Sequence, residues 1–377
     1  MKRINVLFLM PQMGLGGSER LVHSLALRLD RRQFSPSIAW LNGKEVLPEF
    51  RDLRIPLHYL PKTERIDLGT MRSLSRLLLS ERIDVVNAQH FMPAVYAYFG
   101  CNLARHASLV FTEHSRWEVE ETPLKWRIAG TYLLRRIGAS VAVSPDVSAA
   151  IRERFWLDSS RVVTIENGVD LDAFGGEKDV NVLRGSLGLA SHDMVIGTVA
   201  NLKTVKNHQF LLRAFVEVLR EAPNVRLLLV GQGFPGEHDN TEDDLRHFVR
   251  DRRLGDKVLF LGHRSDVPDL LRLMDVFCLP SLREGLPIGL IEAMAAGLPV
   301  VGTNVAGIRD VITPDEDGML VELGDIQALK DALVRLLTDE RRRMALGSSG
   351  RRKAVERYSL QRCVLAYEKL FASLVPH

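Results

Sequence analysis

Two glutamates, Glu284 and Glu292, stand eight positions apart in the segment SLREGLPIGLIEAMAAGLPVV. The pattern places Glu284 in a turn over residues 282–287 and Glu292 inside a helix over residues 288–296. Eight residues along a helix correspond to a rotation of about 80°, so the two carboxylates do not share one face. The two carboxylates could therefore hold two separate parts of one long polar ligand across the helix N-terminus. An anionic group of that ligand would bind at the free N–H groups of Ile288 to Leu290. On spacing alone, a structural interpretation has equal weight: Glu284 would only complement the helix dipole, and Glu292 would only be a solvated helix residue.

The same segment resembles the signature of retaining glycosyltransferases of family 4, in which a Glu, seven residues and a second Glu precede A-M-A-x-G-x-P-V-V. The match runs from Asp275 to Thr303 through DVFCLPS, EGLP and LIEAMAAGLPVVGT. Other landmarks follow in the family's order: GLGGSER (14–20), TEHS (112–115), AVSP (142–145), NGVD (167–170), KNH (206–208) and VGQG (230–233). The resemblance covers nearly the whole chain. It implies the GT-B fold, an α/β architecture of two doubly wound parallel-sheet (Rossmann-like) domains facing an interdomain cleft.

Length and composition agree with two globular domains in 377 residues, 46% hydrophobic and 26% charged. A formal net charge of +3 gives no indication of nucleic acid as a partner. The three cysteines are odd in number, widely spaced and without metal-ligand spacing, which fits a reducing compartment. The apolar run near the N-terminus stops at Pro11 and is interpreted as a buried strand. No apolar run approaches membrane-spanning length, so a cytoplasmic protein is expected, at most peripheral to the inner membrane.

Short apolar runs alternate with helical patterns along the whole chain, which is typical of parallel sheets covered on both faces. The expected strands of the first half are 5–10, 37–41, 84–87, 108–112, 140–143 and 162–165. Those of the second half are 195–200, 226–230, 258–261, 276–279, 300–303 and 318–321. Among the helices expected between them are 19–29, 70–82, 145–155, 209–220 and 326–338.

The predicted join between the domains lies in the Gly- and Asp-rich segment NGVDLDAFGGEKDVN. We assign residues 1–172 to an acceptor-binding N-terminal domain and residues 173–359 to a nucleotide-sugar-binding C-terminal domain. The resemblance implies that the last helix, within residues 360–377, packs back on the first domain. Doubly wound domains bind ligands at the carboxyl ends of their strands.

The first domain offers a glycine loop and two histidines. The loop from Gly14 to Glu19 has the pattern G-x-G-G-S-E, not the G-x-G-x-x-G of dinucleotide enzymes, and alone could be a tight turn. The resemblance implies that Gly16 and Gly17 touch the donor diphosphate. It also implies that His114, just past an expected strand, lines the site beside the transferred sugar. His90 ends another strand and is a weaker candidate near the acceptor.

The second domain offers several polar residues at strand ends. Lys206 keeps a lysine that the family has here, whereas Asn201 stands where relatives have Arg; Lys203 could substitute for that Arg. Solvated surface lysines are the alternative for both cations. Gly231 is expected to let the chain pass under the nucleotide, and Arg264 to contact the base or its phosphates.

Two further segments, residues 315–317 and 124–137, are interpreted as structural and not as parts of a binding site. The acidic run Asp315-Glu-Asp317 is expected to be a solvated turn, so no metal site and no cofactor are predicted. The segment 124–137 is basic and apolar, with one stripe at Trp126, Leu133 and Ile137 and another at Leu124, Ile128 and Tyr132. Two stripes favour a helix buried between neighbours over a membrane-surface helix.

The resemblance as a whole implies a retaining hexosyltransferase. It would move a sugar from a nucleoside diphosphate donor, a UDP-sugar, to a glycan or lipid-linked acceptor in cell-surface polysaccharide biosynthesis. His114, Glu284 and Lys206 are the predicted catalytic residues. The predicted donor site comprises Gly16, Gly17, Asn201, Lys203, Lys206, Gly231, Arg264, Glu284, Gly285, Leu286, Ile288 and Glu292. A nucleotide-sugar epimerase or glycan phosphorylase on the same fold, and a non-catalytic nucleotide-sugar sensor, stay open as alternatives.

Overall fold

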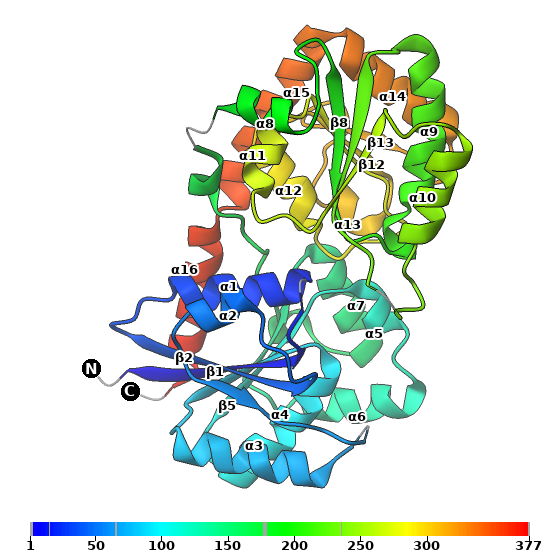
Figure 1. Ribbon diagram of the computed structural model, residues 1–377. Coiled ribbons are helices and arrows are strands. Elements are labelled where there is room, and N and C mark those ends of the chain that lie inside the picture. The colour runs from blue at the N-terminus through cyan, green and yellow to red at the C-terminus, as the bar shows by residue number, and fades with distance from the viewer. Residues whose placement is uncertain (1–2, 15, 65, 176–178, 235, 376–377) are drawn as a thin grey trace. The chain divides into compact units, whose positions relative to one another are not determined.

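The chain folds into two compact α/β units. The first comprises Met1–Gly168 together with Leu360–His377, and the second comprises Val169–Ser359. The division falls just before the boundary predicted at 172/173. Residues 15 and 176–178, parts of the predicted glycine loop and of the predicted join, lie outside the described residues. The computed structural model describes residues 3–14, 16–64, 66–175, 179–234 and 236–375 (Figure 1).

The first unit is built on a parallel sheet in the order β3-β2-β1-β4-β5-β6-β7. Its strands are β1 (Ile4–Gln12), β2 (Phe34–Asn42), β3 (Leu57–Tyr59), β4 (Val85–Gln89), β5 (Ser108–Glu113), β6 (Ala139–Ala142) and β7 (Val162–Thr164). Its connecting helices are α1 (Gly17–Arg28), α2 (Pro48–Asp52), α3 (Leu68–Ser80), α4 (Phe91–Ala104), α5 (Arg116–Glu120), α6 (Leu124–Leu134) and α7 (Pro145–Phe155). The central strands are mostly apolar because helices cover both faces of such a sheet, and their polar residues gather toward the carboxyl ends of β4 and β5.

The C-terminal helix α16 (Leu360–Ser373) belongs to the first unit, at the opposite end of the sequence from β1 and α1. Its Phe371 is fully buried and meets Phe8 of β1 edge to face, with ring centroids 6.2 Å apart. Glu368 accepts a hydrogen bond from the Asp30 amide at 2.7 Å, just beyond α1. Figure 1 shows α16 in red against this unit.

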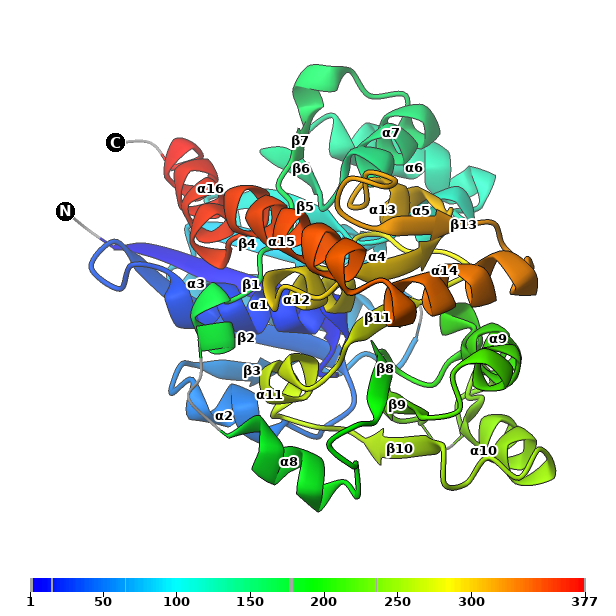
Figure 2. The same cartoon turned by 90° about the horizontal axis from the view of Figure 1, so that it is seen from above.

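The second unit is built on a parallel sheet in the order β10-β9-β8-β11-β12-β13. Its strands are β8 (Met194–Val199), β9 (Val225–Val230), β10 (Val258–Gly262), β11 (Val276–Leu279), β12 (Val300–Thr303) and β13 (Met319–Val321). Its helices are α8 (Val180–Ser186), α9 (His208–Glu221), α10 (Glu242–Asp251), α11 (Val267–Arg272), α12 (Ile288–Ala295), α13 (Ala306–Arg309), α14 (Ile326–Thr338) and α15 (Glu340–Arg357). Helix α15 packs against α12 (Figure 2).

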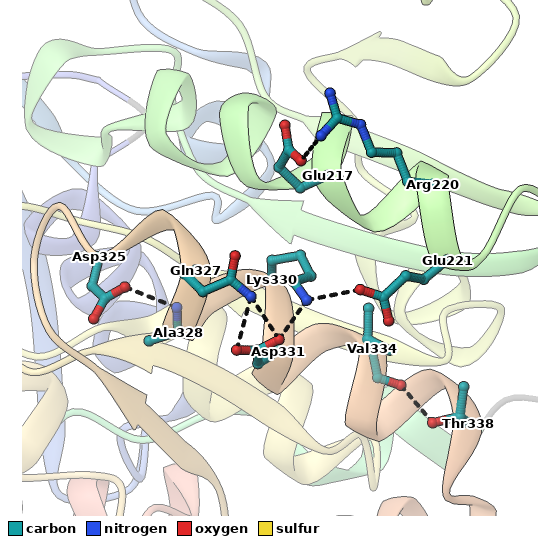
Figure 3. Close-up of polar contacts among 10 residues, drawn as sticks. All are labelled: Glu217, Arg220, Glu221, Asp325, Gln327, Ala328, Lys330, Asp331, Val334 and Thr338. Atoms are coloured by element: carbon teal, nitrogen blue, oxygen red, sulfur yellow. Dashed lines mark hydrogen bonds and ion pairs between the residues drawn. The ribbon is translucent and has the colours of Figure 1, made fainter.

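Helices α9 and α14 pack together on one face of this sheet, and a buried lysine links them. Lys330 of α14 is 9% exposed and donates to Glu221 of α9 at 2.8 Å, and it also pairs with Asp331 (Figure 3). Asp325 caps α14 by accepting from the Ala328 amide at 2.9 Å. The ion pair satisfies a cation that burial would otherwise penalise.

The predicted α/β class with two doubly wound parallel sheets is confirmed. All twelve expected strands are present, but strand β3 was missed. It is three residues long, follows Pro56 and, among the described residues, pairs only with β2, from Ile38 opposite Leu57 to Trp40 opposite Tyr59. Such a short edge strand carries too few residues to show a period.

The interpretation of segment 124–137 is wrong in one respect. Leu133 and Ile137 are buried as expected, but Leu124, Ile128 and Tyr132 are exposed, because nothing covers the outward side of α6 in the part of the chain that the structure describes. Among the described residues, no helix combines the length and the apolar character needed to span a membrane.

Candidate functional site

Each sheet reverses its strand order at one point, and polar side chains follow the strands on both sides of it. In the second unit the reversal lies between β8 and β11, and in the first between β1 and β4. Loops that leave two adjacent strands in opposite directions open a crevice at the carboxyl edge, where doubly wound folds bind ligands. Lys206 follows β8, and Glu284 follows β11.

The second unit brings Lys206 and Glu284 into direct contact. Lys206 Nζ lies 2.6 Å from Glu284 Oε1, and Ser281 Oγ donates to the same oxygen at 2.6 Å. The Glu284 side chain is 6% exposed and that of Lys206 is 25% exposed. The pair therefore presents a partly accessible cation beside a buried carboxylate, which can meet an anionic group and a hydroxyl of one ligand.

Backbone contacts hold the loop that carries Glu284. The Leu282 amide donates to Val205 O at 2.8 Å, which ties this loop to the one that carries Lys206. Thr303 Oγ1, at the end of β12, donates to Ser281 O at 2.5 Å. A Cβ on Gly307 would lie 2.6 Å from Glu284 O and 2.7 Å from Gly285 O, so only glycine lets α13 support the loop this closely.

Helix α12 starts directly after this loop. Pro287 is its N-cap, and a Cβ on Gly289 would lie 2.6 Å from Val199 O, so the helix N-terminus rests on the end of β8. The Leu290 amide donates to Pro287 O at 3.1 Å, so this amide, predicted to be free, is not. Ile288 and Gly289 keep their amides without an acceptor among the described residues, at the positive end of the helix dipole.

Glu292 lies half-buried one turn into α12. Glu284 stands before the helix and Glu292 within it, as their spacing predicts. Gly285 and Leu286 complete the turn between them, both buried. The helix ends as expected at Gly297, whose φ of 84° is left-handed.

The remaining predicted donor residues have partners of their own. Lys203 pairs with Glu237 and lies 3.6 Å from Asp239. Arg264 makes two hydrogen bonds to Asp266, of 2.7 and 2.6 Å. All three cations are thus paired with carboxylates, and only the carboxylate paired with Lys206 is itself a predicted site residue, Glu284.

Gly231 and Asn201 lie where β8 and β9 end. Gly231 has φ 141°, and a Cβ there would lie 2.0 Å from Ala200 O. Chain packing between the two strand ends therefore accounts for this glycine without a nucleotide. Asn201 is half-buried, and its carbonyl accepts from the Lys203 amide at 2.8 Å.

In the first unit, a chain of hydrogen bonds leads to His114. His114 Nε2 lies 2.8 Å from Gln89 Oε1, Gln89 Nε2 donates to Asn87 Oδ1 at 2.6 Å, and Thr112 Oγ1 donates to the same oxygen at 2.9 Å. Because Gln89 presents its carbonyl oxygen, His114 carries its proton on Nε2 when neutral. Asn87 and Gln89 were not predicted from the sequence, because both lie inside a strand and belong to no motif.

His90 lies beside His114, with ring centroids 5.0 Å apart. Its Nδ1 is 3.3 Å from Glu113 Oε1 and 2.9 Å from Glu118 Oε2. Glu113 Oε1 also accepts from the amides of His114 and Ser115, at 2.8 and 3.2 Å. The backbone of His90, at φ 67° and ψ 165°, is in a region that non-glycine residues rarely adopt, which is typical of functional sites.

The two histidines differ in charge. Burial opposes protonation of His90, but its hydrogen bonds to Glu113 and Glu118 outweigh burial and raise the pKa of His90 well above its usual value. Burial, and then the charge of His90, lower the pKa of His114 well below its usual value. At neutral pH the site thus pairs a cationic His90 with a neutral His114.

The same three groups form a possible metal-ligand set. His90, Glu113 and Glu118 each offer one ligand atom, and these atoms lie within 4.8 Å of one another. The contacts described above already provide Glu113 Oε1 with three donors. The geometry fits a hydrogen-bonded ion cluster.

In the described part of the glycine loop, the carboxylate of Glu19 lies against the backbone of the loop. Glu19 is 7% exposed, and its Oε2 would lie 2.6 Å from a Cβ on Gly16. Ser18 Oγ donates to the same carboxylate oxygen at 2.8 Å. A Cβ on Gly16 would therefore force the Glu19 carboxylate to shift, whereas a Cβ on Gly17 would meet open space. The N-terminus of α1 thus already has an acidic partner.

The prediction that residues 315–317 form a solvated turn is correct for Asp315 and wrong for Asp317. Asp317 is 5% exposed, accepts from the Thr313 amide at 2.8 Å, and pairs with Lys353 at 2.7 Å. The ion pair ties the turn to α15, so Asp317 has a structural role. Its sequence neighbours gave no indication of the distant lysine.

Two family models match the chain. "Glycosyltransferase Family 4" matches residues 15–173 and "Glycosyl transferases group 1" matches residues 179–353. Among curated relatives, the chain is 28% identical to the UDP-Gal:alpha-D-GlcNAc-diphosphoundecaprenol alpha-1,3-galactosyltransferase of Escherichia coli, over 82% of this chain and 80% of that protein. It is 27% identical to the N-acetyl-alpha-D-glucosaminyl L-malate synthase of Bacillus anthracis, over 81% and 78%.

Solved structures agree in fold. Anabaena HepE in complex with UDP has a TM-score of 0.87 at 21% identity, covering 98% of this chain and 100% of that one. WaaG, a glycosyltransferase involved in lipopolysaccharide biosynthesis, has a TM-score of 0.74 at 17% identity, covering 97% and 99%. At this level of identity the likeness establishes the fold alone.

Proposed function

Because the chain belongs to glycosyltransferase family 4 and is a glycosyltransferase of the GT-B fold, we propose that it transfers a hexose from a UDP-sugar to a glycan or lipid-linked acceptor, with retention at the anomeric carbon. The E. coli relative is named for a UDP-galactose donor and a diphosphoundecaprenol-linked acceptor, and HepE binds UDP and UDP-glucose. These names support the donor and acceptor classes proposed.

The observation that carries the proposal is the Lys206–Glu284 pair at the switch point of the second sheet. In the proposed complex, Lys206 and the amides of Ile288 and Gly289 receive the diphosphate. The charge that gathers on this leaving group makes their stabilisation stronger in the transition state than in the ground state. Glu284 accepts from the sugar hydroxyls, and Glu292 accepts from the ribose hydroxyls.

His114 is proposed to contact the transferred sugar. A neutral imidazole with Nε2–H donated to Gln89 leaves Nδ1 as a hydrogen-bond acceptor for a sugar hydroxyl. Burial first, and then the positive charge of His90 beside it, lower the pKa of His114 and keep it neutral.

The roles of the two glutamates are tested by calorimetry with UDP. Glu292→Gln should weaken UDP by roughly tenfold or more, because a charged acceptor contributes about 1.5–3 kcal/mol per hydrogen bond. Glu284→Gln should leave UDP affinity nearly unchanged while turnover of the UDP-sugar collapses. Equal weakening by both substitutions, or weakening by Glu284→Gln alone, would contradict the assignment.

Product analysis separates the alternatives. An epimerase would change the donor sugar without any acceptor, a sensor would bind UDP-sugars and never release UDP, and a phosphorylase would need pyridoxal phosphate, visible by its absorbance. Retention predicts that the product keeps the anomeric configuration of the donor sugar, which is read from its NMR coupling constant.

We also propose that the chemical step needs no metal, so turnover should survive excess chelator. A loss of turnover that Mn²⁺ or Mg²⁺ restores would contradict this, and His90, Glu113 and Glu118 would then be the first candidate ligands to substitute.

A further inference from the structure

The outward side of α6 carries large apolar side chains where water would ordinarily select polar ones. Leu124, Ile128 and Tyr132 follow one another at helical spacing and are 64%, 60% and 55% exposed. Trp156, at the end of α7, is 49% exposed beside them. Single exposed apolar residues are ordinary on protein surfaces, but a row of them along one helix marks an interaction site.

Cations surround these apolar groups. Between Pro123 and Gly138 the sequence holds Lys125, Arg127, Arg135 and Arg136 and no carboxylate. The Arg136 guanidinium lies 3.5 Å from the centre of the Tyr132 ring. Lys125 is exposed next to Leu124 in the first turn of α6, and Arg135 and Arg136 are exposed just after the helix ends, close to Tyr132.

Trp156 is tied to this surface by two arginines. The Arg127 guanidinium lies 3.7 Å from the centre of the Trp156 ring, and Arg135 donates to Trp156 O at 2.9 Å. Trp and Tyr rings with an apolar body and a polar edge are enriched at the boundary between lipid and water. We name this surface the α6 face: Leu124, Lys125, Arg127, Ile128, Tyr132, Arg135, Arg136 and Trp156.

The basic character continues into a neighbouring pocket of about 510 Å³. Its lining includes Arg105, His106 and Arg136, and no acidic residue lies among the residues that line it. Arg136 belongs to both the pocket and the α6 face. The pocket can accept an anionic group, such as a phosphate, next to the apolar row.

We propose that the α6 face docks on a lipid bilayer that carries anionic headgroups. Ile128, Leu124 and the aromatic rings would enter the boundary between headgroups and acyl chains. Lys125, Arg135 and Arg136 would reach the headgroup phosphates with their charged ends while their aliphatic stems lie on the apolar groups. The inference goes beyond the proposed reaction and does not depend on it.

A second copy of the chain fits this surface less well. A two-fold contact places the same patch against itself, so the four cations of one α6 face would meet the four of the other without any carboxylate. Anionic headgroups supply the missing countercharges, which is why we favour the bilayer.

Vesicle flotation tests the proposal with the full chain. The protein should float with vesicles of 70:30 phosphatidylcholine and phosphatidylglycerol, should stay behind with pure phosphatidylcholine, and should be released by high salt. Ile128→Asp and the double substitution Arg135→Gln/Arg136→Gln should each weaken binding by roughly tenfold or more. All three side chains are exposed, so thermal unfolding should be unchanged.

The matched control is Met344→Asp. Met344 is 67% exposed on the arginine-rich helix α15, so it tests whether any apolar residue among cations suffices. It should leave vesicle binding unchanged. The proposal is overturned if the unmodified protein ignores anionic vesicles, or if Met344→Asp weakens binding as much as Ile128→Asp. It is also overturned if Ile128→Asp abolishes a dimer in sedimentation while vesicles are ignored.

A fluorescent label gives a direct reading of insertion. The native cysteines Cys101, Cys278 and Cys363 are buried, so an environment-sensitive thiol dye should label an introduced surface cysteine selectively. Emission from Ile128→Cys should shift to the blue on anionic vesicles, and emission from Met344→Cys should not. A shift at position 344 alone would transfer the docking surface to α15 and refute the assignment to α6.

Discussion

Breaking the Lys206–Glu284 pair from either side should destabilise the second unit by unequal amounts. The carboxylate is 6% exposed and the lysine side chain 25% exposed. Lys206→Met leaves a buried carboxylate with Ser281 Oγ as its remaining side-chain donor. Glu284→Gln leaves a cation that can reach water, and the new amide can keep the bond to Ser281. The loss in unfolding free energy depends more on the environment of the partner that stays unpaired than on the hydrogen bond that is removed.

These differences set the magnitudes. Removing one partner of a buried ion pair costs about 3–5 kcal/mol, and we expect about 3 kcal/mol for Lys206→Met because part of the pair is exposed. Glu284→Gln should cost about 1–2 kcal/mol, the range of an ordinary hydrogen bond. The double variant should cost less than the sum of the two.

The assay must separate the two units, which need not unfold together. All four tryptophans, at positions 40, 117, 126 and 156, lie in the first unit, so their fluorescence does not monitor the second. Hydrogen exchange of peptides that cover β8 and β11, as a function of urea, reports on the second unit directly. Lys257→Met is the control, since Lys257 Nζ bonds only a surface carbonyl of Pro223 in the described contacts. The reasoning is refuted if Glu284→Gln costs as much as Lys206→Met.

Three further outcomes are expected. His114→Ala should lower turnover with little change in UDP affinity measured by calorimetry; full activity would remove His114 from the site. Gly307→Ala should weaken UDP binding and lower the unfolding midpoint, because its Cβ would lie 2.6 Å from Glu284 O, and an unchanged protein would show that the loop can move aside. His208 is buried, and burial followed by the charge of Lys206 lowers its pKa to about 3. The unfolded chain then binds a proton that the folded chain refuses, so stability should fall below the unfolded pKa of about 6.5, by about 1.5–2 kcal/mol between pH 6.5 and pH 5. Denaturant titrations at several pH values should show a shallower loss for His208→Leu, and identical slopes would contradict this.

Many of the elements follow from local patterns in the sequence. Apolar runs at strand length, alternating with helical periods, predict all six strands of the second sheet and six of the first, because a parallel strand covered on both faces is apolar throughout. The turn and helix around Glu284 and Glu292 follow from proline, glycine and periodicity. The missed β3 has three residues, too few for a pattern.

The partnerships within the site depend on contacts between residues far apart in sequence. Lys206 and Glu284 are 78 positions apart and meet because β8 and β11 are neighbours in the sheet. The bonds of His114 to Gln89, and of His90 to Glu118, likewise join the end of β4 to the segment that follows its neighbour β5. The sequence marked Lys206 as the lysine that the family keeps and Lys203 as a substitute for a missing arginine, but only the tertiary structure pairs Lys203 with Glu237 and Lys206 with Glu284.

In helix α6 too, the sequence predicts one property and the tertiary structure decides another. Its composition determined that two apolar stripes exist, since helical spacing fixes which side chains share a side. Which stripe is covered depends on the elements that pack on it, and these come from α4 and α7. Periodicity is a local property of the chain, whereas burial is decided by neighbours that the local sequence does not encode. The sequence therefore determined the amphipathic pattern, and only the tertiary structure decided that Leu124, Ile128 and Tyr132 face solvent.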